Sequence, residues 1–300
     1  MNQIYKKSRA KINLTLHILD KRPDGYHNLE SVFQIVHLYD ELFIEKTEDN
    51  HLTLICNVKE LENENNIIYK AYHTLKQKHS GLPGVKVTLK KNIPSGAGLG
   101  GGSANCASFL TAMNQLFDLH YSKQDLINIG KTLGADVPPC LHNGALLAQG
   151  IGEILTPICT NMKYYIVLVK PDISFNTKLM YAKLDERKNN VSKQHSATHP
   201  VETKTNFLSH KAIQSLETNN MSSLCNNLYN NFEQTLAKDS EIFTIQHLLL
   251  EHGALCSSMT GSGSACFGIF DDKELSKKAY QSLKKTYQSF WSMPKNSEKL

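Results

Sequence analysis

The sequence lacks the features of several common classes of protein. No uninterrupted apolar run approaches the roughly 20 residues that cross a bilayer, and the longest candidate, residues 164–169, has only the length of a strand. The first residues show neither the continuous apolar segment nor the small-residue cleavage site of a secretory signal. The sequence therefore predicts no membrane span and no membrane partner, and we expect the protein in the cytoplasm.

Patterns for metal clusters and for nucleic acid are also missing. The 7 cysteines are scattered without a C-x-x-C pair, which favours reduced, mostly buried thiols. The 33 lysines and arginines outnumber the 28 aspartates and glutamates, but they form no dense basic block. Such an excess suits an anionic small molecule as well as a nucleic acid, so local motifs must decide between them.

What the sequence does contain is enough apolar material for a large core. Its 300 residues are 40% hydrophobic, which favours two globular domains. Residues 9–18 alternate and predict a strand with one dry face and one polar face, the latter bearing Lys11 and Asn13. A Pro-Asp-Gly turn follows and places Tyr26 and His27 just beyond a loop tip. Short antiparallel strands are expected near residues 30–38, 41–46 and 51–56.

A glycine-rich loop is the sharpest feature of the sequence. It follows an alternating strand at residues 85–91 and precedes a helix, and residues 96–102 include five glycines. Such a run cannot be a helix interior, and it leaves backbone N–H groups free to converge on an anion. A helix N-terminus adds partial positive charge and further unpaired donors. The sequence therefore predicts a phosphate-binding loop.

Two well-known phosphate-binding motifs match this glycine-rich loop poorly. Gly96, Gly98 and Gly101 satisfy G-x-G-x-x-G, but the strand before them alternates instead of being apolar throughout. The acidic residue expected at the end of the next strand is absent, because a helix ends there, near Asp118. The G-x-x-x-x-G-K-[ST] motif of P-loop proteins is also absent.

The remaining segments predict helices and an α+β second half. Asn65 or Asn66 can cap one helix, and Ser122 can cap another that runs to Gly134. Two prolines then place Asp136 on a stiff extended segment. Further on we expect a buried strand at 164–169, a solvated or disordered insert at 186–206, helices within 207–236 and 241–252, a strand at 265–270 and a helix from 273.

The glycine loop and three other stretches resemble the GHMP kinases, the family of galactokinase, homoserine kinase and mevalonate kinase. The loop matches the family's P-x-x-x-G-L-G-G-G-S-S signature. The other stretches, in the family's order, resemble a branch that phosphorylates a cytidine diphosphate-linked methylerythritol. They are Ala10-Lys11-Ile12-Asn13-Leu14 with Arg22-Pro23-Asp24-Gly25-Tyr26-His27, Gly134-Ala135-Asp136-Val137-Pro138, and Thr260-Gly261-Ser262-Gly263.

The resemblance implies a role for each matching residue. Asp136 is the catalytic base and Lys11 polarises the hydroxyl of the substrate. Asn13, Tyr26, His27 and Tyr181 bind the substrate, and Asn66 and Lys91 lie near adenine. The remaining matches bind or support the phosphates of ATP: Pro94, Ser95, Gly96, Ala97, Gly98, Leu99, Gly100, Gly101, Gly102, Ser103 and Ala104, with Gly261, Ser262 and Gly263 in support.

The resemblance also implies the fold and the reaction. We expect a two-domain α+β kinase, with a ribosomal protein S5 domain 2-like domain at residues 1–158 and a ferredoxin-like domain at 159–300. ATP with Mg²⁺ would phosphorylate the 2-hydroxyl of the small-molecule substrate, without a nucleic-acid partner; Ser103 and Asp136 are candidate magnesium ligands. Another small-alcohol kinase, for mevalonate or homoserine, is one alternative. A non-catalytic nucleotide- or RNA-binding protein on an S5-like scaffold is another.

Overall fold

The computed structural model describes residues 2–194 and 205–296. The chain divides into two compact units. One comprises residues 1–11, 35–95 and 100–143, and the other comprises residues 12–34, 96–99 and 144–300. This division differs from the single boundary expected after residue 158, because two long strands, β1 (Gln3–Lys21) and β2 (His27–Lys46), each contribute one part to either unit.

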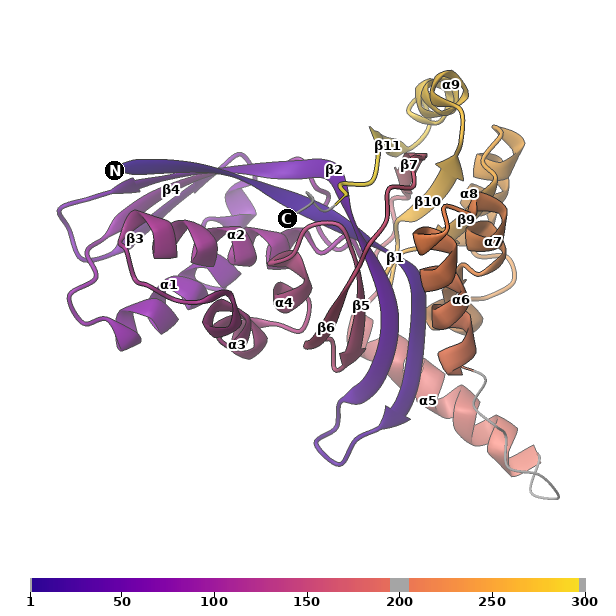
Figure 1. Cartoon of the computed structure of the whole chain (residues 1–300), viewed down its shortest axis with the longest axis horizontal. Helices are drawn as coiled ribbons and strands as arrows, with labels where there is room; N and C mark the ends of the chain where they lie inside the picture. Colours follow the sequence, from indigo (N-terminus) through magenta and orange to yellow (C-terminus); the bar gives the residue numbers. More distant parts are fainter. Residues whose placement is uncertain (1, 195–204, 297–300) are drawn as a thin grey trace. The chain divides into compact units, whose positions relative to one another are not determined.

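The first unit is a sheet covered by helices. Its strands lie in the order β3 (Leu52–Cys56), β4 (Val85–Lys90), β2, β1. Three helices, α1 (Ile67–Lys78), α2 (Gly101–Leu116) and α3 (Lys123–Leu133), cover one face of this sheet (Figure 1). Their apolar sides and those of the strands form one core. Two short helices complete the unit, η1 (Lys59–Leu61) and α4 (Val137–Cys140).

Two predicted helix caps are confirmed in this unit. The Asn66 side chain accepts a hydrogen bond from the Ile68 N–H at the start of α1. Ser122 and Asp125 form a reciprocal capping box at the start of α3. Both caps satisfy N–H groups that have no partner within their own helix, so the local sequence fixes where these helices begin.

The strand predictions need three corrections. The polar face of β1 is as dry as its apolar face: Lys11 and Asn13 are each 2% exposed and His17 is fully buried. Burial lowers the pKa of His17 to about 4, so its ring is neutral. The separate strands expected at 30–38 and 41–46 are one continuous strand, β2. Strand β3 pairs with β4 in parallel, not antiparallel. Alternation reports the polarity of side chains and does not report what covers them.

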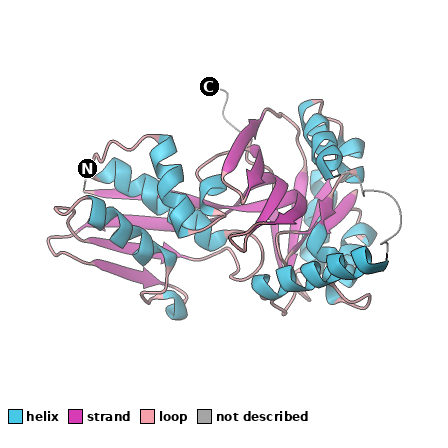
Figure 2. Ribbon diagram, turned by 90° about the horizontal axis from the view of Figure 1, so that it is seen from below, coloured by secondary structure: helices cyan, strands magenta, loops and turns pink. Residues whose placement is uncertain are grey.

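The second unit contains a four-stranded antiparallel sheet, as a ferredoxin-like domain requires. The order is β11 (Gln288–Ser292), β7 (Tyr165–Lys170), β10 (Cys266–Phe270), β9 (Cys256–Met259). Helix α8 (Glu241–Glu251) packs on β9 and β10, and α9 (Lys273–Leu283) packs on β7 and β11. Figure 2 shows helices, in cyan, lying against strands, in magenta. Strand β5 (Ala145–Gly150) pairs with β2, and β6 (Ile154–Ile158) pairs with β5. The short β8 (Tyr229–Asn230) pairs with β1.

The polar insert at 186–206 is only partly a loop. Its first part continues helix α5 (Thr177–Gln194), and Thr205 begins α6 (Thr205–Glu217). The prediction of a loop or disordered segment is therefore wrong at both ends of the insert, and residues 195–204 lie outside the described residues. A polar helix needs only a narrow apolar side, which composition alone does not reveal. Helix α7 (Met221–Asn226) and η2 (Asn231–Thr235) follow.

The cysteines differ from expectation at one pair. Cys225 and Cys256 form a disulfide with their Cα atoms 5.3 Å apart, so the prediction that every thiol is reduced is wrong for these two. Their separation of 31 residues carries no motif that would show the contact in the sequence. Cys56, Cys106 and Cys266 are free and buried, as expected. Within the described ranges, no helix is both long enough and apolar enough to cross a membrane.

Candidate active site

A lysine and an aspartate come together in the first unit. Lys11 Nζ lies 3.4 Å from the Asp136 carboxylate, and the lysine side chain is 3% exposed while that of Asp136 is 41% exposed. The lysine stem also lies against the backbone of Gly100, where an added Cβ would come within 3.0 Å of Lys11 Cγ. An accessible carboxylate with a fixed cation beside it is placed to accept a proton from a bound hydroxyl.

The local structure at Asp136 differs from the extended segment that was expected. Asp136 is the N-cap of the short helix α4, with φ −85° and ψ −1°, and Val137 is already helical. The two prolines are tolerated because they lie in the first turn, where backbone N–H groups have no intrahelical acceptor. Burial, with a contribution from the Asp136 charge, raises the pKa of the nearby Cys140 thiol, so the thiol stays protonated.

The N-terminus of α2 is open to an anion. Gly100 is its N-cap in the left-handed conformation, no side chain caps the helix, and no acidic residue lies in its first turn. Gly102 is exposed, and a Cβ placed on it would meet nothing within 4 Å. Neither a side chain nor a negative charge therefore competes for the first N–H groups of this helix.

The centre of the glycine loop belongs to the second unit and lies against the turn before β10. A Cβ on Gly98 would stand 2.0 Å from the carbonyl oxygen of Thr260. The Ala265 N–H donates to the Ala97 carbonyl oxygen at 3.1 Å. The Thr260 hydroxyl accepts a hydrogen bond from the Asn13 N–H at 3.0 Å, so Thr260 links this turn to β1 as well. Thr260 belongs to the Thr260-Gly261-Ser262-Gly263 stretch that resembles the family, but no role of its own was assigned to it from the sequence.

The Gly261-Ser262-Gly263 turn is held by contacts of its own. The Asn230 side chain donates to the carbonyl oxygens of Met259 and Gly261. Gly263 has φ +85°, and a Cβ there would come within 2.7 Å of the Met259 and Phe175 side chains, so a larger residue would be strained. These contacts fix the backbone of the turn beside residues 97–98 of the glycine loop.

The structure brings His27 and Tyr181 together in the second unit. Their rings stack with centroids 4.9 Å apart and planes 20° apart. Tyr181 lies on α5, and the edge of its ring meets Phe232. Tyr26 is 59% exposed, at the turn closed by the hydrogen bond from the Gly25 N–H to the Arg22 carbonyl oxygen. Tyr26 and His27 are adjacent in sequence. An exposed ring can stack on a planar base, and a buried imidazole beside it can form a hydrogen bond to the edge of that base.

Comparison with known proteins agrees with this geometry. Residues 66–144 match the GHMP kinases N terminal domain, and residues 212–289 match the GHMP kinases C terminal domain. The chain is 40% identical over 291 residues to 4-diphosphocytidyl-2-C-methyl-D-erythritol kinase of Alkaliphilus oremlandii, covering 96% of this chain and 95% of the relative. It is 41% identical to the enzyme of the same name from Thermoanaerobacter pseudethanolicus, covering 96% and 94%. The chain belongs to the GHMP kinases.

Solved structures of GHMP kinases have the same fold. A crystal structure of 4-(cytidine 5'-diphospho)-2C-methyl-D-erythritol kinase superposes with a TM-score of 0.79 at 25% identity, covering 98% of this chain and all of that one. Homoserine kinase from Cytophaga hutchinsonii superposes with a TM-score of 0.74 at 17% identity, covering 99% and 96%. The second likeness concerns the fold alone. The two-domain α+β prediction is confirmed.

Asp185 is a residue of this GHMP kinase that sequence reasoning missed. Its carboxylate lies 2.7 Å from His27 Nε2, and Lys21 donates to its other oxygen at 2.8 Å. Partial burial raises the pKa of Asp185, but the hydrogen bonds from Lys21 and His27 together lower it by more. The net shift of the pKa is therefore downward. Asp185 stands four residues after Tyr181 on α5, so the helical spacing was the available signal.

We expect Asp185→Ala to raise the KM for the acceptor substrate about tenfold, the effect of about 1.4 kcal/mol, because His27 loses the carboxylate that orients its ring. The KM for ATP should stay within twofold. Steady-state ADP release checks both constants. Lys21→Met is the control, since it removes the 58% exposed partner and leaves the His27 contact intact. A raised KM for ATP with an unchanged KM for the acceptor would show that Asp185 and His27 do not act in acceptor binding.

Two residues expected near adenine have other partners. The Asn66 side chain caps α1 and donates to the Leu61 carbonyl oxygen. Lys91 is 6% exposed at its side chain, and its ammonium is bound to Asp40 and Asn105. The geometry thus assigns both side chains contacts within the first unit.

Proposed function

We propose that this GHMP kinase transfers the γ-phosphoryl group of ATP to the 2-hydroxyl of 4-diphosphocytidyl-2-C-methyl-D-erythritol, a step of the non-mevalonate route to isoprenoid precursors. The observation that carries the proposal is the buried Lys11 beside the accessible Asp136, in a chain 40% identical to a relative of that name. Its partners are then two small molecules, and its place of action is the cytoplasm.

The proton of the acceptor hydroxyl has to leave as its oxygen attacks the γ-phosphorus. Asp136 takes that proton, because its carboxylate is accessible and lies beside the Lys11 ammonium. Lys11 also stabilises negative charge that develops on the attacking oxygen. The lysine is positioned for this by its burial on β1 and by the backbone of Gly100 against its stem.

The phosphates of ATP bind to backbone donors rather than to a dedicated lysine. The N–H groups of Gly101, Gly102 and Ser103 at the start of α2 supply the positive end of the helix. The rest of the loop, residues 94–100 and Ala104, sets the path of the backbone, and Gly261, Ser262 and Gly263 support it through the contacts around Thr260. Asn66, and the backbone around Lys91, would border the adenine.

Magnesium fits this donor set as a companion of the nucleotide. Mg²⁺ keeps several waters and takes one or two protein oxygens in phosphoryl-transfer sites. The Ser103 hydroxyl in the first turn of α2 and the Asp136 carboxylate are the oxygens that would hold it. When bound, Mg²⁺ supplies positive charge that offsets the negative charge on the phosphates.

The cytidine end of the acceptor is recognised by Tyr26, His27 and Tyr181, the aromatic cluster of the second unit. Tyr26 and Tyr181 provide faces on which cytosine can stack, and His27 provides a hydrogen bond to the edge of the base. Asn13 binds the methylerythritol or diphosphate part, and its amide is oriented by a hydrogen bond to the Ser31 hydroxyl at 2.8 Å.

A comparison of acceptors tests the proposal. Purified protein with MgATP is given 4-diphosphocytidyl-2-C-methyl-D-erythritol, mevalonate, homoserine or no acceptor, and ADP release is followed. We expect turnover with the cytidyl substrate alone. Turnover on mevalonate or homoserine would overturn the assignment of the aromatic cluster. Intact ATP binding without turnover on any acceptor would favour a non-catalytic nucleotide-binding protein.

A further inference from the structure

We propose that Asp40, a buried aspartate outside the expected site, is the positioning residue that sets the geometry of both ends of the phosphate-binding loop and thereby the affinity for ATP. The inference rests on the proposed function of that loop. Asp40 lies on β2 and is fully buried, so it touches neither substrate nor solvent. A charged carboxylate in such a place is costly unless it is fully paired.

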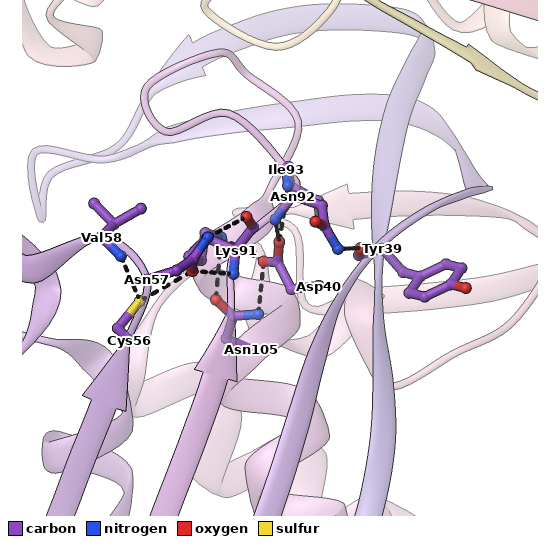
Figure 3. Close-up of polar contacts among 9 residues, drawn as sticks. All are labelled: Tyr39, Asp40, Cys56, Asn57, Val58, Lys91, Asn92, Ile93 and Asn105. Atoms are coloured by element: carbon purple, nitrogen blue, oxygen red, sulfur yellow. Dashed lines mark hydrogen bonds and ion pairs between the residues drawn. The ribbon is translucent and has the colours of Figure 1, made fainter.

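The carboxylate of Asp40 has four donors (Figure 3). One oxygen accepts hydrogen bonds from the backbone N–H groups of Asn92 at 2.7 Å and Ile93 at 2.8 Å. The other oxygen accepts from the Asn105 side-chain amide at 2.9 Å and from the Lys91 ammonium. The charge of Asp40 is thus compensated entirely by groups of the first unit.

These donors lie on either side of the glycine loop. Residues 91–93 follow β4 and lead directly into Pro94, where the loop begins, and Asn105 lies on α2 one residue after Ala104, where the loop ends. One carboxylate therefore ties the entry of the loop to the helix whose N-terminus is its exit. Asn57 adds to the entry, since its side chain accepts from the Lys91 N–H and donates to the Lys91 carbonyl oxygen.

Lys91 and Asn105 also bind each other, so that Asp40, Lys91 and Asn105 form one cluster of mutually bonded side chains. The Lys91 ammonium donates to the Asn105 side-chain oxygen at 3.2 Å while both bind Asp40. A Cβ on Gly101 would stand 3.1 Å from Lys91 Nζ and 3.0 Å from Ile93 Cγ2. The first residue of α2 thus packs directly on the cluster, so a shift of Lys91 moves the helix terminus that is proposed to bind phosphate.

A packing role alone would be met as well by apolar side chains of similar volume. The directional bonds of Asp40 instead fix two backbone N–H groups and one side chain on the far side of the loop. Phosphate affinity depends on N–H groups that are aimed before the ligand arrives, because donors that must be reorganised bind less tightly. The cluster provides that preorganisation for the glycine loop.

Asp40→Asn tests the proposal, with Glu41→Gln as the matched control. Glu41 is the next residue on β2 and pairs at the surface with Lys90, the neighbour of Lys91. We expect the dissociation constant of a fluorescent ATP analogue, and the KM for ATP, to rise at least tenfold in Asp40→Asn, while the KM for the acceptor stays within twofold. Glu41→Gln should match the wild type. Equal affinity for ATP in folded Asp40→Asn, or the same loss in Glu41→Gln, would overturn the proposal.

Asn105→Ala decides the matter if Asp40→Asn does not fold. It removes one donor and keeps the ion pair, and its control is Asn114→Ala, which breaks the contacts of Asn114 with the Tyr121 backbone at the other end of α2. We expect ATP affinity to fall about fivefold in Asn105→Ala alone; equal affinity in the two variants overturns the inference. ATP binding needs no acceptor, so wild-type protein that binds ATP but phosphorylates nothing would defeat only the proposed function. Wild-type protein that binds no ATP would defeat both.

Discussion

Replacing Asp136 by asparagine is expected to lower kcat about a thousandfold. The variant keeps the size of the side chain but removes the group that accepts the hydroxyl proton, and general base catalysis contributes roughly 10²- to 10⁴-fold. The KM for ATP should change little, because the donors proposed for the phosphates lie on the glycine loop and α2. Initial rates of ADP release at saturating substrates measure the loss.

Asp125→Asn is the control for this experiment. Asp125 is exposed and its carboxylate belongs to the capping box of α3, so its replacement costs about 1 kcal/mol of stability and leaves turnover unchanged at 25 °C. A kcat within a few-fold of the wild type in Asp136→Asn would remove Asp136 from the mechanism. Loss of ATP binding with an unchanged kcat in that variant would limit Asp136 to holding the magnesium of ATP.

Gly98→Ala should destabilise the protein by about 3 kcal/mol and abolish detectable ATP binding. Gly98 has φ +75°, and an added Cβ would lie 2.0 Å from a backbone oxygen of Thr260, which no side-chain rotation can relieve. The left-handed conformation costs about 1–2 kcal/mol for other residues, and overpacking costs about 1–3 kcal/mol more. Urea unfolding measures the stability, and a fluorescent ATP analogue measures binding.

Gly102→Ala separates the two effects of a glycine in this loop. Its Cβ would meet nothing within 4 Å, and alanine favours a helix, so the variant should be at least as stable as the wild type. Its ATP affinity should nevertheless fall, because the methyl group stands at the N–H groups proposed for phosphate.

Wild-type stability in Gly98→Ala would show that the contact with Thr260 does not constrain the loop.

Local signals in the sequence were sufficient for the parts of the fold that depend on neighbouring residues. The caps at Asn66 and Ser122 and the glycine loop before α2 are set within a few residues of chain, and all were predicted. The α4 helix was not, because the disfavoured helical geometry before a proline is outweighed when the proline lies in a first turn.

Contacts across long stretches of chain could not be predicted in the same way. Asp40 meets its donors 51 to 65 residues later in the sequence, and Asp185 meets His27 at a separation of 158 residues. Neither aspartate belongs to a motif, and each would pass for an ordinary surface carboxylate until the strands and helices are placed. The motif residues Lys11 and Asp136 were predicted together only because the resemblance to a family supplied their roles.

Transfer of labelled phosphate is the most direct test of the proposed reaction. Wild-type protein is incubated with γ-³²P-ATP, Mg²⁺ and 4-diphosphocytidyl-2-C-methyl-D-erythritol, and the position of the phosphate in the product is determined by NMR on an unlabelled parallel reaction. We predict one labelled product, phosphorylated at the 2-hydroxyl, which Asp136→Asn forms about a thousandfold more slowly. Release of inorganic phosphate without a phosphorylated product, or phosphorylation at another hydroxyl, would contradict the proposed reaction.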